Sequence, residues 1–102
     1  RGLGDVDKRQ AIICATDTIA MGCMKVLKDH GLRIPEDVSV TGFGGYWTST
    51  VMSPALTTIK FHYAHAGQTA GQIILDMIEE KEVERATLID FTFIEGESVR
   101  SI

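Results

Sequence analysis

The first half of the chain alternates between short apolar runs and an amphipathic stretch. Ala11–Ala15 is continuously apolar, which predicts a strand buried on both faces. Apolar residues then recur at helical spacing over 19–27, and Gly31 follows where a helix-ending glycine is expected. Val38–Thr41 predicts a second strand. A strand, a helix and a strand in this order form a βαβ unit, which implies a parallel sheet.

The second half continues the same pattern. Leu56–Ile59 predicts a third strand, and the apolar face of Tyr63–Ile78 predicts a long amphipathic helix. Apolar and polar residues alternate over 89–93, as in a half-exposed edge strand. The predicted fold is therefore α/β, with an open parallel sheet flanked by helices.

These few elements cannot cover both faces of such a sheet. Four strands and two or three helices leave one face open, because each βαβ crossover covers a single face. We therefore expect a truncated domain whose apolar surface needs a missing segment or a partner chain, and an isolated fragment that self-associates.

The composition narrows the class of protein. The net charge is -4, and the ten Lys and Arg residues are scattered, so no basic patch is present to hold nucleic acid. The apolar runs are too short to span a bilayer, and no secretory signal opens the chain. Cys14 and Cys23 form no C-x-x-C motif, so we expect reduced thiols in a cytoplasmic protein.

Candidate binding residues follow the predicted strands. Ligands of open parallel sheets bind beyond the carboxyl ends of the strands. Thr16 and Asp17 offer acceptors for sugar hydroxyls there, Gly44 permits close backbone approach, and Phe61 with Tyr63 offers flat apolar faces. Helix capping by Thr16 and Asp17, and core packing of the two aromatic residues, are the alternatives.

Enzyme chemistry finds no support in the sequence. Gly42-x-Gly44 lacks the third glycine of a dinucleotide fingerprint, because Trp47 occupies that place. P-loop and G-x-S-x-G motifs are absent. His62 and His65 have no further Cys or His nearby to complete a metal site. We expect neither catalysis nor a cofactor nor a metal.

Three segments together resemble the LacI/GalR family of transcriptional regulators. They read AIICATDTIAMGCMKVL over 11–27, GLRIPEDVSVTGF over 31–43 and PALTTIKFHYAHAG over 54–67. The short stretch Glu95–Val99 is similar to the closing segment of the family, with Glu95 in place of the usual arginine. The resemblance covers nearly the whole chain.

The resemblance implies a fold and a place within it. Residues 1–102 would be the C-terminal fragment of an effector-binding and dimerisation domain that is similar to type I periplasmic binding proteins. Most of the fragment would lie in the C-terminal lobe, with about 61–84 crossing towards the N-terminal lobe. Operator DNA would be bound only by a helix-turn-helix upstream of this chain.

The family's binding residues carry over to specific positions. Thr16 and Asp17 match a polar pair that faces the sugar cleft, and Phe61 and Tyr63 match the crossover beside it. Gly44 stands where many members place a hydroxyl-binding Asp, which is a departure. The Phe-Gly-Gly-Tyr sequence resembles repressors of sucrose- or trehalose-type operons and points to a disaccharide or its phosphate.

A homodimer interface is also implied. Met21, Met24, Trp47 and Val51 match interface positions of the family, and core packing is the alternative for each. The leading hypothesis is thus a sugar-responsive repressor. A periplasmic sugar-binding protein of the same fold is the alternative, and an α/β enzyme fragment is a third class.

Overall fold

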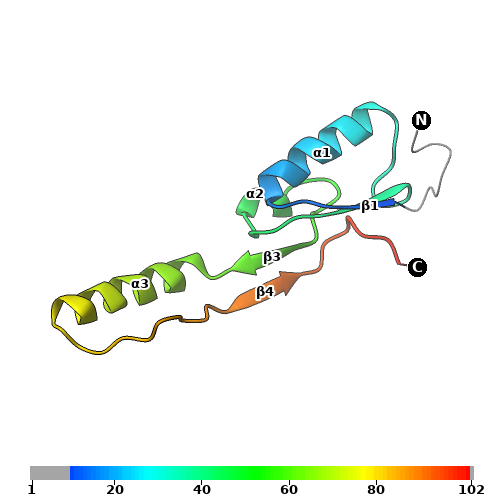
Figure 1. The fold of residues 1–102 in the computed structure, drawn as a ribbon. Helices are drawn as coiled ribbons and strands as arrows, with labels where there is room; N and C mark the ends of the chain where they lie inside the picture. The colour runs from blue at the N-terminus through cyan, green and yellow to red at the C-terminus, as the bar shows by residue number, and fades with distance from the viewer. Residues whose placement is uncertain (1–9, 102) are drawn as a thin grey trace. The chain divides into compact units, whose positions relative to one another are not determined.

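The computed structural model describes residues 10–101 and divides the chain into two units. The elements are β1 (Gln10–Ile13), α1 (Asp17–Asp29), β2 (Val38–Thr41), α2 (Trp47–Thr50), β3 (Thr58–Phe61), α3 (Tyr63–Ile78) and β4 (Phe91–Ile94) (Figure 1). The first unit comprises 1–60 and 93–102, and the second comprises 61–92. Strands β3 and β4 pair with each other, and the division between the units runs through both.

The sheet of the first unit is parallel, as predicted. β1 pairs with β2 in parallel, from Gln10 opposite Val38 to Ile13 opposite Thr41. Two parallel bridges, Thr41 with Thr57 and Gly44 with Lys60, continue the pairing onto the β3 segment. The predicted α/β class with an open parallel sheet is confirmed.

Helix α1 begins and ends where its sequence signals lie. The Thr16 hydroxyl accepts a hydrogen bond from the backbone N–H of Ile19 at 3.1 Å, so Thr16 caps the helix N-terminus. At the other end, Gly31 has a φ of 81° and its N–H donates to the carbonyl of Lys28 at 3.0 Å. A glycine tolerates this left-handed backbone without steric cost.

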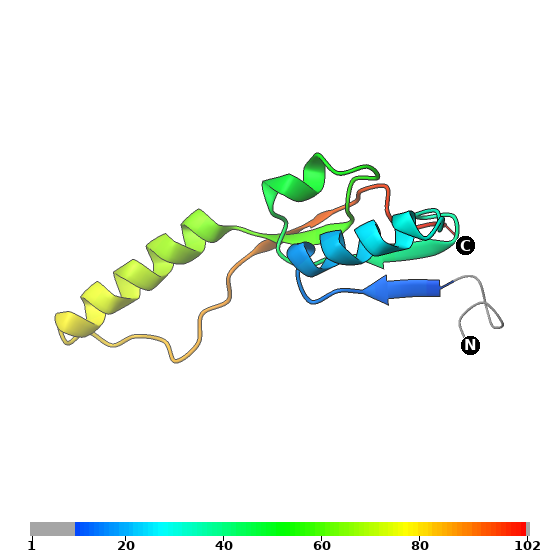
Figure 2. The ribbon, with the colours of Figure 1, turned by 90° about the horizontal axis from the view of Figure 1, so that it is seen from above.

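One face of the β1–β2 pair carries the core. Helix α1 lies along this pair in both views (Figures 1 and 2). The buried apolar residues are Cys14, Ala20, Met24, Ile34, Val38, Val40 and Leu56. The prediction that β1 is buried on both faces is wrong, because Ile13 is 85% exposed. An apolar run shows which residues could be buried, but burial needs a neighbouring element. The described elements cover only one side of β1.

The C-terminal segment completes the first unit. Ser98 is fully buried, and its backbone carbonyl accepts a hydrogen bond from the N–H of Val40 at 2.9 Å. Its hydroxyl accepts a hydrogen bond from the N–H of Thr57 at 2.9 Å. This residue therefore supports β2 and the β3 segment from the end of the chain.

The second unit contains no buried residue among those the structure describes. Helix α3 spans the predicted apolar face, yet Ile74, Met77 and Ile78 on that face are more than half exposed. Phe91 and Phe93 on β4 are exposed as well, so this strand is more open than the predicted half-exposed edge. The segment expected to cross between lobes, about 61–84, falls in this unit, and its crossing stays a prediction.

Candidate functional site at the carboxyl ends of three strands

The carboxyl ends of β1 and β2 meet the β3 segment at one edge of the first unit. The backbone N–H of Asp17 donates to the carbonyl of Phe43 at 3.1 Å, which joins the start of α1 to the loop after β2. The N–H of Gly44 donates to the carbonyl of Ile59 at 2.7 Å, which joins that loop to β3. The loops after β1 and β2 therefore lie beside strand β3, at the edge where ligands of open parallel sheets bind.

The carboxylate of Asp17 is the centre of this edge. Its Oδ2 accepts hydrogen bonds from the backbone N–H of Tyr46 at 2.9 Å and from the hydroxyl of Ser49 at 3.0 Å. Its Oδ1 accepts a hydrogen bond from the hydroxyl of Thr58 at 2.6 Å. Because a buried carboxylate is stable only when it is hydrogen-bonded, these three donors hold Asp17 in place.

The position of Asp17 favours a structural role. Its exposed fraction is 0% and its oxygens face protein donors, while a direct contact with an effector stays a prediction. Gly42 leaves the necessary room, since a Cβ at residue 42 would lie 2.4 Å from Asp17 Oδ1. Asp17 therefore organises the edge as a positioning residue, because its hydrogen-bonding capacity is satisfied internally.

Thr16 lies beside Asp17 but remains partly accessible. Its side chain caps α1, which confirms the capping interpretation. A hydroxyl that accepts one hydrogen bond keeps a second lone pair and its own proton. The cap and a ligand contact are therefore compatible, and the ligand contact stays a prediction.

Gly44 and Gly45 shape the loop after β2. Both have positive φ, 131° and 72°, a backbone that side chains rarely adopt. A Cβ at Gly45 would lie 2.4 Å from the Cβ of Lys60, so the Lys60 stem rests against this glycine. The sequence places Lys60, Phe43 and Tyr46 at the strand ends without marking them as binding residues, and the structure leaves the rings of Phe43 and Tyr46 exposed.

Phe61 and Tyr63 belong to the second unit. Their ring centroids are 6.1 Å apart with an interplanar angle of 68°, an edge-to-face pair. Tyr63 is 48% exposed and Phe61 is half-buried, so neither is packed in a core within the described residues. Their contact with an effector stays a prediction.

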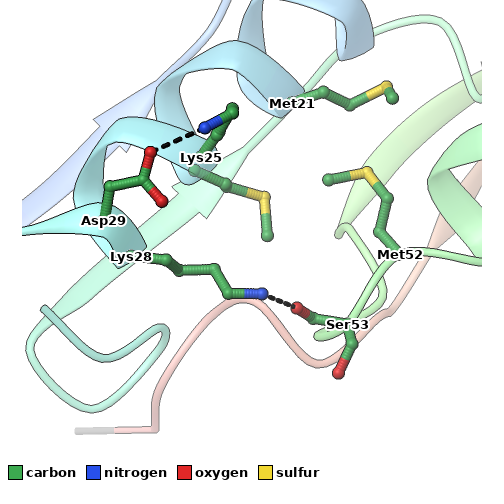
Figure 3. Close-up of a pocket in the computed structure, with 7 residues that line it drawn as sticks. Met21, Lys25, Lys28, Asp29, Met52 and Ser53 are labelled. Carbon is green, nitrogen blue, oxygen red and sulfur yellow. Dashed lines mark hydrogen bonds and ion pairs between the residues drawn. The ribbon is translucent and has the colours of Figure 1, made fainter. Parts of the chain in front are cut away.

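A methionine-lined groove of about 400 Å³ lies beside α1 (Figure 3). Met21 and Met24 line it from the helix, and Met52 lines it from the loop after α2. The ammonium of Lys28 donates to the carbonyl of Ser53 at 2.8 Å and holds the loop against α1. Met52 carries no sequence signal beyond its apolar character next to Val51 and was not among the expected interface residues.

The four expected interface residues divide by exposure. Met24 is 2% exposed and belongs to the core cluster, which favours the core-packing alternative at this position. Trp47 and Val51 are 74% and 70% exposed, and Met21 is half-buried at the groove. These three present apolar surface to solvent, and their role in a dimer stays a prediction.

Metal and membrane sites receive no support from the described part of the chain. Residues 10–101 hold no group of three or more His, Cys, Asp or Glu side chains arranged to bind a metal ion. Within the same residues, no helix combines the length and the apolarity needed to cross a bilayer.

The sequence of this chain matches a known protein family over nearly its whole length. The family described as a periplasmic binding protein-like domain matches residues 3–99. This chain belongs to that family. Its members' fold accounts for the parallel sheet and for the loops that gather at the strand ends.

Two relatives of known class are transcriptional regulators. The HTH-type transcriptional repressor PurR of Vibrio cholerae is 42% identical over 81 residues, which are 78% of this chain and 24% of PurR. The HTH-type transcriptional regulator RegA of Clostridium acetobutylicum is 34% identical over 95 residues, 92% of this chain and 28% of RegA. The chain thus spans about a quarter of the length of these relatives.

Solved structures of transcriptional regulators superpose on this chain. The lac repressor dimer bound to operator and the anti-inducer ONPF superposes with a TM-score of 0.86 at 28% identity, over 96% of this chain and 34% of that one. A LacI-type regulator from Bifidobacterium animalis subsp. lactis gives a TM-score of 0.79 at 34% identity, over 89% and 33%. The expected LacI/GalR resemblance is confirmed.

Proposed function

We propose that this chain is the effector-sensing and dimer-forming part of a sugar-responsive transcriptional repressor. The observation that carries the proposal is the Asp17 carboxylate, which joins the start of α1 to the segments that follow β2 and lead into β3. A ligand on this edge would contact two loops and a strand that are already fixed to one another. Such preorganisation reduces the entropy lost on binding.

The proposed effector is a small sugar, with a disaccharide or a sugar phosphate as the favoured class. Thr16 would exchange hydrogen bonds with a sugar hydroxyl, the backbone at Gly44 would allow close approach, and Phe61 and Tyr63 would offer apolar faces. Asp17 is enclosed, so its carboxylate is not accessible at this edge of the first unit. Acceptors for further hydroxyls would come from the other lobe of the domain.

Helix α1 would link effector binding to dimerisation. Its N-terminus carries Thr16 and Asp17, and its side carries Met21 in the methionine-lined groove. We propose that a second copy covers Met21, Trp47 and Val51 to form a homodimer. An effector that favours one position of α1 would then shift the arrangement of the dimer, which is how a ligand biases two states.

The test uses the full-length protein. Its melting temperature is measured with a panel of disaccharides and sugar phosphates, and its operator affinity is measured with each. We expect one compound to raise the melting temperature and to change operator affinity about tenfold, a usual coupling strength. Thr16→Ala should weaken that compound's binding, while Thr16→Ser, which keeps the hydroxyl, should retain it.

The alternative function predicts a different protein. A periplasmic sugar-binding protein would bind the same class of ligand, carry a signal peptide and bind no operator. A gene that encodes a signal peptide and no helix-turn-helix would overturn the repressor proposal. Turnover of a sugar by the full-length protein would favour the enzyme class.

A further inference from the structure

The edge around Asp17 has an uneven distribution of charge. Residues 14–18, 42–47 and 58–60 form this edge, and they contain two charged side chains, Asp17 and Lys60. The Asp17 carboxylate is fully buried and accepts three hydrogen bonds from protein donors. Lys60 is exposed, and within residues 10–101 no hydrogen bond or ion pair engages its ammonium. The accessible charge of these segments is therefore positive.

Backbone contacts place Lys60 beside the two glycines of the loop after β2. Gly44 pairs with Lys60 in a parallel bridge, and the N–H of Gly44 donates to the carbonyl of Ile59 at 2.7 Å. A Cβ at Gly45 would lie 2.4 Å from the Cα and Cβ of Lys60 and 2.8 Å from its Cγ. The first part of the Lys60 side chain thus runs along bare backbone, where only a glycine leaves room. Both glycines and Lys60 belong to the first unit.

We infer that Lys60 selects an anionic effector, a sugar that carries a phosphate group, over a neutral sugar. The inference rests on the proposed function and names the chemical class of ligand at the same edge. A phosphate monoester carries a charge of about -1.5 to -2 at pH 7 and has three strong acceptor oxygens. It would therefore form charge-assisted hydrogen bonds with the ammonium, which are about twice as strong as the neutral ones that a sugar hydroxyl can form.

The enclosure of Asp17 favours an anionic ligand as well. An accessible carboxylate at this edge would repel a phosphate group, whereas the Asp17 oxygens face the donors of Tyr46, Ser49 and Thr58. The dipoles of these donors reduce the negative potential that reaches the surface. Because Gly44 has no side chain, phosphate oxygens could approach the backbone and the ammonium together.

The contact with Gly45 also lowers the entropic cost of using a lysine. A lysine side chain that is free to rotate loses much conformational freedom when it binds a ligand. The first carbons of the Lys60 side chain already lie against Gly45, so part of this freedom is absent before the ligand arrives. An ammonium held in this way discriminates better between ligands than one on an unrestricted side chain.

Matched pairs of sugars test the inference on the full-length protein. Calorimetry gives the dissociation constants of glucose, sucrose and trehalose and of their 6-phosphates, with glucuronate as a sugar that carries a carboxylate. We expect at least one sugar phosphate to bind at least about tenfold more tightly than its neutral form, and more tightly than glucuronate. The difference should shrink as ionic strength is raised, because salt screens charges that water reaches.

Substitutions separate the charge of Lys60 from its shape. Lys60→Met keeps the aliphatic stem and removes the ammonium, so it should weaken binding of that sugar phosphate about tenfold. The affinity for the neutral sugar and the melting temperature of the ligand-free protein should stay unchanged. Lys60→Arg keeps the charge and should retain most of the affinity. Lys81→Met is the matched control, because it removes the same charge from an exposed lysine after α3 and should leave both affinities unchanged.

The outcomes distinguish this inference from the proposed function. Equal affinity for the phosphorylated and neutral forms, or an equal loss for both in Lys60→Met, would show that Lys60 does not recognise charge, and the proposed function would stand. Tighter binding of glucuronate than of any sugar phosphate would overturn the assignment to phosphate. If none of these sugars bound in either form, the inference and the proposed function would both fail.

Discussion

The carboxylate of Asp17 accepts a hydrogen bond from the hydroxyl of Thr58 at 2.6 Å, across 41 residues of sequence. This contact ties the first turn of α1 to β3, and the same carboxylate also reaches the segment after β2. The edge proposed to bind an effector is therefore built around a buried acidic group whose oxygens are hydrogen-bonded within the protein.

Replacing Asp17 should weaken both folding and effector response. Hydrogen bonds to a charged group each contribute about 1.5–3 kcal/mol, so Asp17→Ala should lower the stability of the domain by more than about 3 kcal/mol. Asp17→Asn keeps the volume but exchanges one acceptor oxygen for a donor, so it should recover only part of the loss. Thermal melting of the full-length protein measures both. An unchanged melting temperature for Asp17→Ala would contradict the positioning role.

Two glycines offer a matched pair of substitutions. A Cβ at Gly42 would lie 2.4 Å from Asp17 Oδ1 and 2.7 Å from Leu56, so Gly42→Ala should displace the buried carboxylate and destabilise the domain. Gly22 lies on α1 with nothing within 4 Å of an added Cβ. Gly22→Ala should stabilise the helix by about 0.5–1 kcal/mol. Opposite shifts in melting temperature are expected, and a loss for both would count against this explanation.

Met24 and Met21 should respond to substitution in different assays. Met24 is buried, so Met24→Ala should cost about 2–5 kcal/mol of stability through the cavity it leaves. Met21 is half-buried in a groove that Lys25 and Lys28 also line. Met21→Lys should therefore leave folding largely intact but weaken self-association at least about tenfold, because a third ammonium would enter the groove.

Sedimentation velocity of the full-length protein checks the Met21 variant. Gln68→Lys is the matched control, because Gln68 is an exposed residue on α3 and the substitution adds the same charge. If both variants kept the wild-type dimer affinity, the groove would not be the interface.

Alkaline pH should destabilise the domain through Cys14. The folded state raises the pKa of this thiol by burying it, so the unfolded chain loses the proton first as pH rises. The protonated Cys14 thiol makes its full contribution to the free energy of unfolding below the ordinary thiol pKa. That contribution is lost as pH rises through the higher pKa of the thiol in the folded state. Melting temperature under reducing conditions should therefore fall less steeply with pH in Cys14→Ala than in the wild type. Parallel pH profiles would show that another group is responsible.

Local patterns in the sequence determined the elements of this protein. A helix with its apolar face over Tyr63–Ile78, a helix-ending glycine at 31 and a parallel pairing of a strand near 11–15 with one at 38–41 were all predictable, and the structure places the first strand at 10–13. Helical periodicity and backbone preferences depend on residues that are close in the chain. They can therefore be recognised in a single sequence. The family motifs, read in order, also indicated the correct class of protein.

Tertiary packing decided which of these residues face inward. Met21 and Met24 lie three residues apart on one helix, yet only Met24 is enclosed. Ile13 belongs to an apolar run but faces outward, because burial depends on what covers a strand. Asp17 has the sequence signature of a helix start, but its hydrogen-bond donors come from Tyr46, Ser49 and Thr58. Such distant partners are brought together only by the folded chain, so no local pattern could reveal them.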